Sequence, residues 1–115
     1  MNRLMIRVEA EDEWSRRIVQ AVERGKPQPP GYSFTTEEDL LDTLTANRFA
    51  ILKALTGAGP LGVRELARRV GRDVRAVHAD AGRLASIGLI DKTSDGKLHF
   101  PYDEVRIEMA WHAAA

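Results

Sequence analysis

Apolar residues alternate with charged or polar ones near both ends of the chain. The alternation covers residues 3–9 and 104–111, and a period of two is typical of half-buried strands. The apolar positions are Leu4, Ile6 and Val8 in the first segment and Val105, Ile107 and Met109 in the second. Because lone strands leave open edges and an uncovered face, we expect the two strands to pair, within one chain or across a dimer.

Charges on the two predicted strands are complementary. Arg3 and Arg7 can face Glu104 and Glu108 across such a pair. Surface pairs of this kind contribute only about 0.2–1 kcal/mol each, so we expect the apolar faces to set the register. The residues predicted to serve dimerisation or capture of a partner are Leu4, Ile6, Val8, Trp14, Val105, Ile107 and Met109.

Helical spacing appears three times in the first half of the chain. Residues 11–24 carry Trp14, Ile18, Ala21 and Val22 at helical intervals, with three acids in the first turn, where the helix dipole favours them. Residues 25–31, GKPQPPG, form a stiff connector. The TTEEDLLDTL run at 35–44 predicts a short capped helix. A further helix is expected over 45–55, with Phe49, Leu52 and Leu55 facing inward.

Residues 61–100 hold the most informative pattern, a short helix, a glycine turn, a longer helix and a hairpin. The first helix places Val63, Leu66, Ala67 and Val70 on one face and ends at Gly71. The second begins after Asp73, whose carboxylate can cap it, and ends at Gly88; its apolar set is Val74, Val77, Ala81, Leu84 and Ile87. Asp95-Gly96 predicts a two-residue hairpin turn, in which both residues need a positive φ.

This order of elements predicts a mainly helical protein with a small β component, a winged helix-turn-helix. In such proteins the second helix of the pair enters the major groove of DNA. We expect a strand-helix arm and linker over residues 1–31, a DNA-binding domain over 32–103, and a C-terminal strand and tail over 104–115.

Composition limits the chemistry that the chain can perform. A chain of 115 residues is too short for a separate catalytic domain, and it contains no cysteine for disulfides or thiolate metal sites. Its three histidines lie in different predicted elements, and GAGPLG at 57–62 does not follow a strand as a dinucleotide fingerprint must. We expect no enzyme activity, cofactor or metal. The apolar stretch at the start of the chain is too short, and too soon interrupted by charged residues, for a signal peptide or a membrane span. We therefore expect a cytoplasmic protein.

The charge of the chain is balanced overall, but basic and acidic residues gather in different segments of the sequence. Residues 47–100 hold ten Lys or Arg against five Asp or Glu, a formal charge of +5, whereas the remainder holds seven against twelve, or −5. A basic half of this kind can meet phosphates, while the acidic half stays away from them or meets another partner.

The basic half supplies the candidate DNA contacts. On the second helix, Arg75 lies in the first turn, where a bidentate arginine can read guanine. The predicted contacts of this helix and the turn before it are Arg72, Arg75, Ala76, His78, Ala79 and Arg83. The supporting helix and the wing add Arg64, Arg68, Lys92 and Lys97. Asp80 is out of place among these cations. We expect it to form an ion pair that orients an arginine, one of Arg64, Arg68 and Arg69 being a candidate.

Residues 34–109 resemble a known family. RELA, GRD, V-x-x-D-x-x-x-L and GLI are similar to segments of prokaryotic winged-helix DNA-binding regulators with MarR-like architecture, some of which look like antitoxins of type II toxin-antitoxin pairs. The resemblance implies DNA contact from Arg72, Arg75, His78, Ala79 and Arg83, and an orienting role for Asp80. The chain departs from the pattern at Gly62, where a Ser or Thr cap is usual, and at Gly82 inside the second helix.

Together these features predict a homodimeric, sequence-specific repressor that binds double-stranded DNA and acts on its own operon. The family resemblance implies a further role as the antitoxin of a small basic ribonuclease-like toxin, which the acidic half of the chain could bind. The alternative is a protein-interaction scaffold that keeps the same helices without binding DNA. Pairing of Arg72, Arg75 and Arg83 with acids of their own chain would favour the scaffold, and their standing unpaired beside Lys92 and Lys97 would favour DNA.

Overall fold

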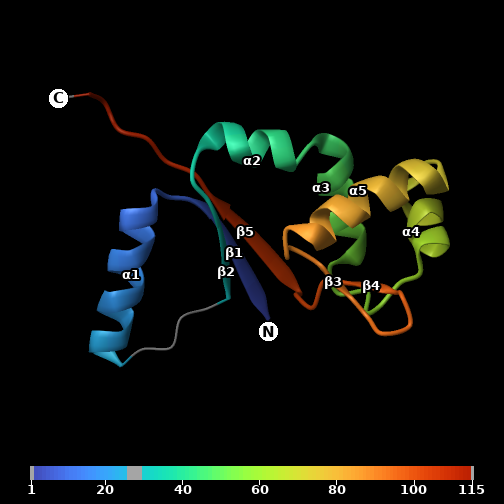
Figure 1. Ribbon diagram of the computed structural model, residues 1–115, viewed down its shortest axis with the longest axis horizontal. Coiled ribbons are helices and arrows are strands. Elements are labelled where there is room, and N and C mark those ends of the chain that lie inside the picture. The colour runs from blue at the N-terminus through green and yellow to red at the C-terminus, as the bar shows by residue number, and fades with distance from the viewer. Residues whose placement is uncertain (1, 26–29, 115) are drawn as a thin grey trace.

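The structure, a computed structural model, describes residues 2–25 and 30–114. Most of the predicted connector at 25–31 therefore lies outside the described residues. Five helices and five strands follow one another along the described part (Figure 1). Their bounds are β1 Arg3–Val8, α1 Glu11–Arg24, β2 Gly31–Phe34, α2 Glu37–Thr43, α3 Ala46–Leu55, α4 Val63–Val70, α5 Val74–Ser86, β3 Asp91–Lys92, β4 Leu98–His99 and β5 Glu104–Glu108.

The expected fold class is wrong. The protein has a mixed α/β fold, 48% helical, in which three strands form a parallel sheet in the order β2-β1-β5. The prediction of a mainly helical winged helix-turn-helix failed because it treated the terminal strands as appendages and overlooked Gly31–Phe34 as a strand. Parallel strands need a crossover connection, and α1 supplies it between β1 and β2.

The predicted pairing of the terminal strands is confirmed, and it occurs within one chain. β1 pairs in parallel with β5, with Arg3 beside Glu104 and Arg7 beside Glu108. Both predicted ion pairs form, at 3.2 Å between Arg3 Nε and Glu104 Oε1 and at 3.0 Å between Arg7 Nε and Glu108 Oε2. The second strand ends at Glu108, three residues before the predicted end at 111.

The sheet has one apolar face and one polar face. In-register neighbours share a face, so Leu4 and Ile6 of β1 lie on the same side as Phe34 of β2, and all three are buried. On the polar side, Glu9 accepts hydrogen bonds from Arg17 at 2.7 Å and from Ser33 at 2.8 Å. The hydrogen bond from Arg17 is the main reason that the pKa of Glu9 lies below its usual value.

Local signals explain the helices. The sequence left Thr35 and Thr36 open as the cap of the 35–44 helix, and Thr36 is the cap, accepting from the Asp39 N–H at 3.1 Å. The predicted cap Asp73 is confirmed, because it accepts from the N–H of Arg75 at 3.1 Å. Gly71 ends α4 with a φ of 69°, a left-handed conformation that glycine adopts without strain.

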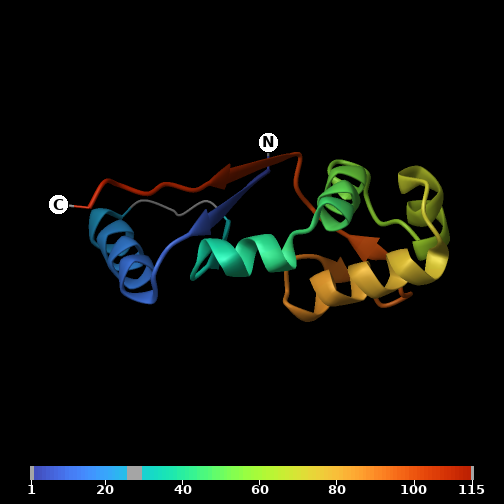
Figure 2. The same cartoon turned by 90° about the horizontal axis from the view of Figure 1, so that it is seen from above.

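Sheet and helices share one hydrophobic core. It joins Leu4 and Ile6 of the sheet to the inner faces of α2–α5, and Ile6, Leu66 and Leu84 are fully buried. Val74, predicted to be inward, is 40% exposed, because it lies in the first turn of α5 before the helix reaches its neighbours. Figure 2 shows α3, α4 and α5 gathered at one end of the molecule, with the sheet and α1 at the other.

α1 is the least buried of the described helices longer than two turns. Ala21 is its one buried residue, and Trp14, Val19 and Val22 are exposed (45%, 54% and 74%). Figure 1 shows α1 on the far side of the sheet from α3–α5. Among the described residues, none of the helices has the length and apolar character that crossing a lipid bilayer requires.

Candidate nucleic-acid interface

One face of α5 is open to solvent, while the opposite face forms part of the core. Val77, Ala81 and Leu84 are buried at helical spacing. The exposed face consists of Arg75, His78, Ala79 and Arg83, all predicted as DNA contacts from the sequence, together with Gly82, and Ala76 is half-buried at its border. The sequence therefore identified this face correctly as a surface, and what the surface binds is a separate question.

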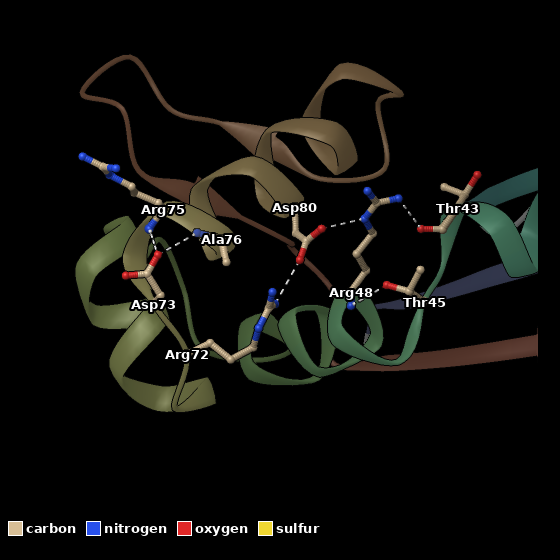
Figure 3. A network of polar contacts seen from close by, with 8 residues as sticks. All are labelled: Thr43, Thr45, Arg48, Arg72, Asp73, Arg75, Ala76 and Asp80. Carbon is tan, nitrogen blue, oxygen red and sulfur yellow. Dashed lines mark hydrogen bonds and ion pairs between the residues drawn. The ribbon is translucent and has the colours of Figure 1, made fainter.

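Positive charge on this face is not neutralised by the chain itself. Within the described part of the protein, neither Arg75 nor Arg83 forms an ion pair. Asp80 is the one acidic residue within α5, and it is turned toward the interior side of the helix (Figure 3). Among the residues of α5 itself, the outer face thus presents two arginines and no carboxylate, while the exposed Asp73 caps the start of the helix by accepting from the Arg75 and Ala76 N–H groups.

Asp80 holds two arginines from other parts of the helical unit. Its carboxylate accepts from Arg48 Nε of α3 at 3.0 Å and from Arg72 Nη1, in the turn before α5, at 2.9 Å (Figure 3). Arg48 also donates to the Thr43 carbonyl at 3.0 Å. The side chains of Asp80, Arg48 and Arg72 are 18%, 21% and 24% exposed. Burial alone would raise the pKa of Asp80, but the two arginines outweigh it and lower that pKa.

The expectation that Asp80 orients an arginine is confirmed, but the arginines differ from those proposed on α4. Arg68 and Arg69 instead share Glu65, at 2.6 Å and 3.1 Å, and these contacts lower the pKa of Glu65. They are three and four residues from Glu65 and reach it on the same helix face. Arg64 is exposed and forms no ion pair among the residues described.

Arg48 was missed as a site residue because no local pattern points to it. It follows the α3 cap Thr45 by three residues, and its link to Asp80 spans 32 positions. The one sequence feature that pointed to a buried partner was Asp80, an acid surrounded by basic residues in the sequence. Arg72, predicted as a DNA contact, is half-buried and held by Asp80, whereas Arg75 points away from this cluster (Figure 3). The two arginines therefore have different roles, one in positioning α5 and one on its outer face.

The hairpin lies beside α5, but its turn differs from the prediction. Gly96 has a φ of 85°, whereas no residue other than glycine has a positive φ in the described chain, so Asp95 cannot occupy the predicted two-residue turn. The turn instead spans four residues, with the Gly96 N–H donating to the Thr93 carbonyl at 2.9 Å. Thr93 stabilises the turn further, because its hydroxyl accepts from the Lys97 N–H at 2.9 Å and donates to Asp95.

Lys92 and Lys97 project from the two sides of this hairpin. Lys92 is exposed and has no ion-pair partner in the described residues, while Lys97 Nζ lies 3.9 Å from Asp95 Oδ2. A hollow of about 420 Å³ separates the hairpin from α5, with His78, Gly82 and Lys92 among its lining residues. The exposed face of α5 and the hairpin thus form two sides of one concave surface.

The residues predicted for dimerisation differ in how far they are buried. Leu4 and Ile6 are buried inside their own chain, so they are not a surface that a partner can contact. Val8, Val105 and Met109 are half-buried. Ile107 and Trp14 remain exposed, at 44% and 45%.

At the end of α5, a tyrosine from β2 is hydrogen-bonded to the backbone. The Tyr32 hydroxyl donates to the Ile87 carbonyl at 2.8 Å. Burial raises the pKa of Tyr32, and the nearby Arg83 guanidinium opposes that shift. The position of α5 is thus fixed at its middle by Asp80, which holds Arg48 and Arg72, and at its end by Tyr32.

Comparison with protein-family models gives a match. Residues 43–107 fit the model of a protein family described as HVO_A0114, a match that covers α3, α4, α5, the hairpin and nearly all of β5. No curated protein matches the chain. Since the matched segment is more than half of the 115 residues, the chain belongs to the HVO_A0114 family.

Proposed function

We propose that the protein binds double-stranded DNA through the exposed face of α5 and regulates transcription. The observation that supports this function most strongly is the presence of Arg75 and Arg83, both without ion pairs in the described structure, on the outer face of α5. The acid within α5, Asp80, is engaged behind this face, and Asp73 caps the start of the helix. An α-helix fits the major groove of B-DNA, which is about 12 Å wide. The +5 charge of residues 47–100 would attract the phosphates.

Each residue of this surface has an expected role. Arg75, in the first turn of α5, would hydrogen-bond to a guanine edge, because base contacts come from the start of a helix that enters the groove. Ala76 and Ala79 are small enough to approach thymine methyl groups. Arg83, Lys92 and Arg64 would contact phosphates, which fix orientation without reading sequence. His78 and Lys97 lie between these groups and complete the surface.

The Asp80 cluster would act indirectly. Through Asp80, Arg48 attaches α5 to α3 and Arg72 attaches α5 to the turn before it, so the exposed face would be presented by a helix with little freedom to rotate. Fixing contact residues on a rigid element lowers the entropy cost of binding. This role differs from the DNA contact predicted for Arg72. It also explains why pairing of Arg72 does not by itself favour a scaffold function.

The direct test is binding of a labelled duplex from upstream of the gene at about 50 and 200 mM salt. We expect affinity to fall steeply with salt, because binding of cations to phosphates releases counterions. Arg75→Ala should weaken binding by about tenfold or more, equivalent to about 1–3 kcal/mol for a base-contacting arginine. Arg16→Ala is the matched control, an arginine 68% exposed on α1. Equal affinity for wild type and Arg75→Ala would overturn the assignment.

A second candidate function is capture of a protein partner by the acidic half, as in an antitoxin. The observation that favours it is α1, which leaves Trp14, Val19 and Val22 exposed above a first turn containing three acids. A basic partner with an apolar patch would fit this helix. Co-purification of the neighbouring gene product with wild type, and its loss with Trp14→Ala, is the expected result. A partner retained by Trp14→Ala would exclude α1 as its docking site.

A further inference from the structure

The outer edge of β5 carries backbone groups that no strand of the described chain pairs with. β5 lies at the end of the sheet order and pairs with β1 alone. The Glu104 N–H donates toward β1, to the Asn2 carbonyl at 3.2 Å. Because backbone groups point to alternate sides along a strand, those of Val105 and Ile107 point to the open edge. In Figure 2, β5 and the segment after it follow the outer border of the molecule.

Apolar side chains accompany this edge. Ile107 is 44% exposed on β5, and Trp111 is 79% exposed three residues after the strand ends. Between β5 and α3 there is a groove of about 330 Å³, lined by apolar residues such as Phe49 and Leu52, with Lys53 at its side. An open strand edge beside an uncovered apolar groove favours association, and natural proteins usually block such edges.

We propose that a second copy of this chain pairs its own β5 with this edge, antiparallel, about a two-fold axis at Ile107. Ile107 then lies opposite the partner's Ile107, and Val105 lies opposite the partner's Met109. Arg106 faces the partner's Glu108, and the symmetry repeats this opposite-charge pair on the other side of the axis. The two three-stranded sheets join into one continuous sheet of six strands.

Charge selects this register over its nearest alternative. An axis at Arg106 would also bring outward-pointing backbone groups together. It would, however, place Arg106 opposite the partner's Arg106 and Glu104 opposite the partner's Glu108, and like charges directly opposite each other are destabilising. Moving the axis by one residue to Ile107 replaces these repulsions by Arg-Glu pairs and an apolar centre.

The same register gives the exposed tryptophan a place. When the strand continues past Glu108, the partner's Trp111 lies opposite Asp103, at the border of the groove between β5 and α3. Positions of equal parity share a face, so this indole is on the apolar side together with Val105 and Ile107. The groove is thus filled by an aromatic residue from the second copy. This interface is remote from the exposed face of α5, and it forms whether or not the protein binds DNA.

A single-cysteine experiment tests the register, because the chain has no cysteine of its own. We expect wild type to sediment as a dimer and Ile107→Cys to form a disulfide-linked dimer rapidly under mild oxidation, since the two thiols lie opposite each other. Arg106→Cys, the neighbouring exposed position, should cross-link much more slowly. A monomeric wild type, or faster cross-linking at 106 than at 107, overturns the proposal.

A charge exchange tests the pairing without cross-linking. Arg106→Glu alone and Glu108→Arg alone each place like charges across the axis, and we expect each to weaken the dimer by about tenfold or more. Mixing the two variants restores opposite charges at both pairs, so a mixed dimer should form at wild-type affinity. Arg16→Glu is the control, and circular dichroism verifies that each variant is folded. Failure of the mixture to associate, or unchanged dimers in the single variants, contradicts this interface.

Discussion

The two ends of the molecule use charge in opposite ways. In the sheet, Arg3 and Arg7 pair with Glu104 and Glu108 on an open face, so cations are neutralised where solvent can reach them. In the helical unit, one acid, Asp80, neutralises cations on the inner side of α5, and the outer side keeps its arginines unpaired among the described residues. Both ends nonetheless share one hydrophobic core.

This difference separates structural from functional charge. Exposed ion pairs contribute little to folding, so the pairs on the sheet serve mainly to match strand to strand. An unpaired cation on a rigid helix costs little in water and stays available for an anionic ligand. The proposed DNA contact therefore uses the unpaired cations of the helical unit, and the proposed dimer uses the open strand edge of the sheet.

The largest expected effect tests whether the two ends share a core. Ile6→Ala in the sheet and Leu84→Ala in α5 remove fully buried side chains, and each should reduce the free energy of unfolding by about 2–5 kcal/mol. Val22→Ala, at a site 74% exposed on α1, should change it by less than about 0.5 kcal/mol. Urea denaturation measures all three. A small effect of Ile6→Ala alone would show that the sheet is stabilised separately from the helices.

A smaller effect is expected at Asp80. Asp80→Asn leaves Arg48 and Arg72 without their counter-charge at sites about four-fifths covered, and should cost about 1–2 kcal/mol after allowance for solvent screening. Affinity for DNA should fall as well, because α5 loses its attachment to α3. If stability falls but affinity does not, the cluster has no positioning role.

The stability difference between wild type and Asp80→Asn should depend on pH. The pKa of Asp80 is lower in the folded protein than its ordinary value of 3.8, so its contribution to stability is complete above that value and is lost as pH falls through the folded pKa. Between about pH 5 and 2, wild type should therefore lose more stability than Asp80→Asn. Parallel curves for the two proteins would contradict the account of this cluster.

The smallest predicted effect concerns Gly82 on the exposed face. A Cβ added at Gly82 would meet nothing within 4 Å, so the glycine is not required for packing in the chain. Gly82→Ala should increase stability by about 0.5–1 kcal/mol, because glycine is costly inside a helix. If DNA approaches α5 closely there, affinity should fall despite the gain in stability. An affinity that stays constant would place the DNA elsewhere on the face.

The sequence predicted local structure better than the fold. The helix over residues 11–24, a threonine cap at 35 or 36 and the cap Asp73 were predicted correctly, because helix periodicity and capping are local properties. The short Gly31–Phe34 strand has no long alternation and forms only because β1 lies beside it. Missing this strand led to the wrong fold class. Pairing of the two terminal strands was predictable, since their charges and apolar positions match.

In the candidate site, too, the sequence predicted local features but not contacts between distant residues. Exposure of Arg75, His78 and Ala79 followed from helical spacing once the buried positions were assigned. The contact between Arg48 and Asp80 depends on how α3 packs against α5, which no local pattern specifies. Nor did the Asp95-Gly96 dipeptide determine its turn, because the Thr93 side chain and carbonyl stabilise a longer loop.

The central claim is that the outer face of α5 reads DNA sequence. The most direct measurement compares the affinity for the upstream duplex with that for a scrambled duplex, in wild type, Arg75→Ala and Lys92→Ala. We predict that wild type prefers the upstream duplex and that Arg75→Ala loses this preference. Lys92→Ala should weaken binding to both duplexes equally, as expected of a phosphate contact. Equal binding of both duplexes by wild type, or an unchanged preference in Arg75→Ala, would contradict the claim.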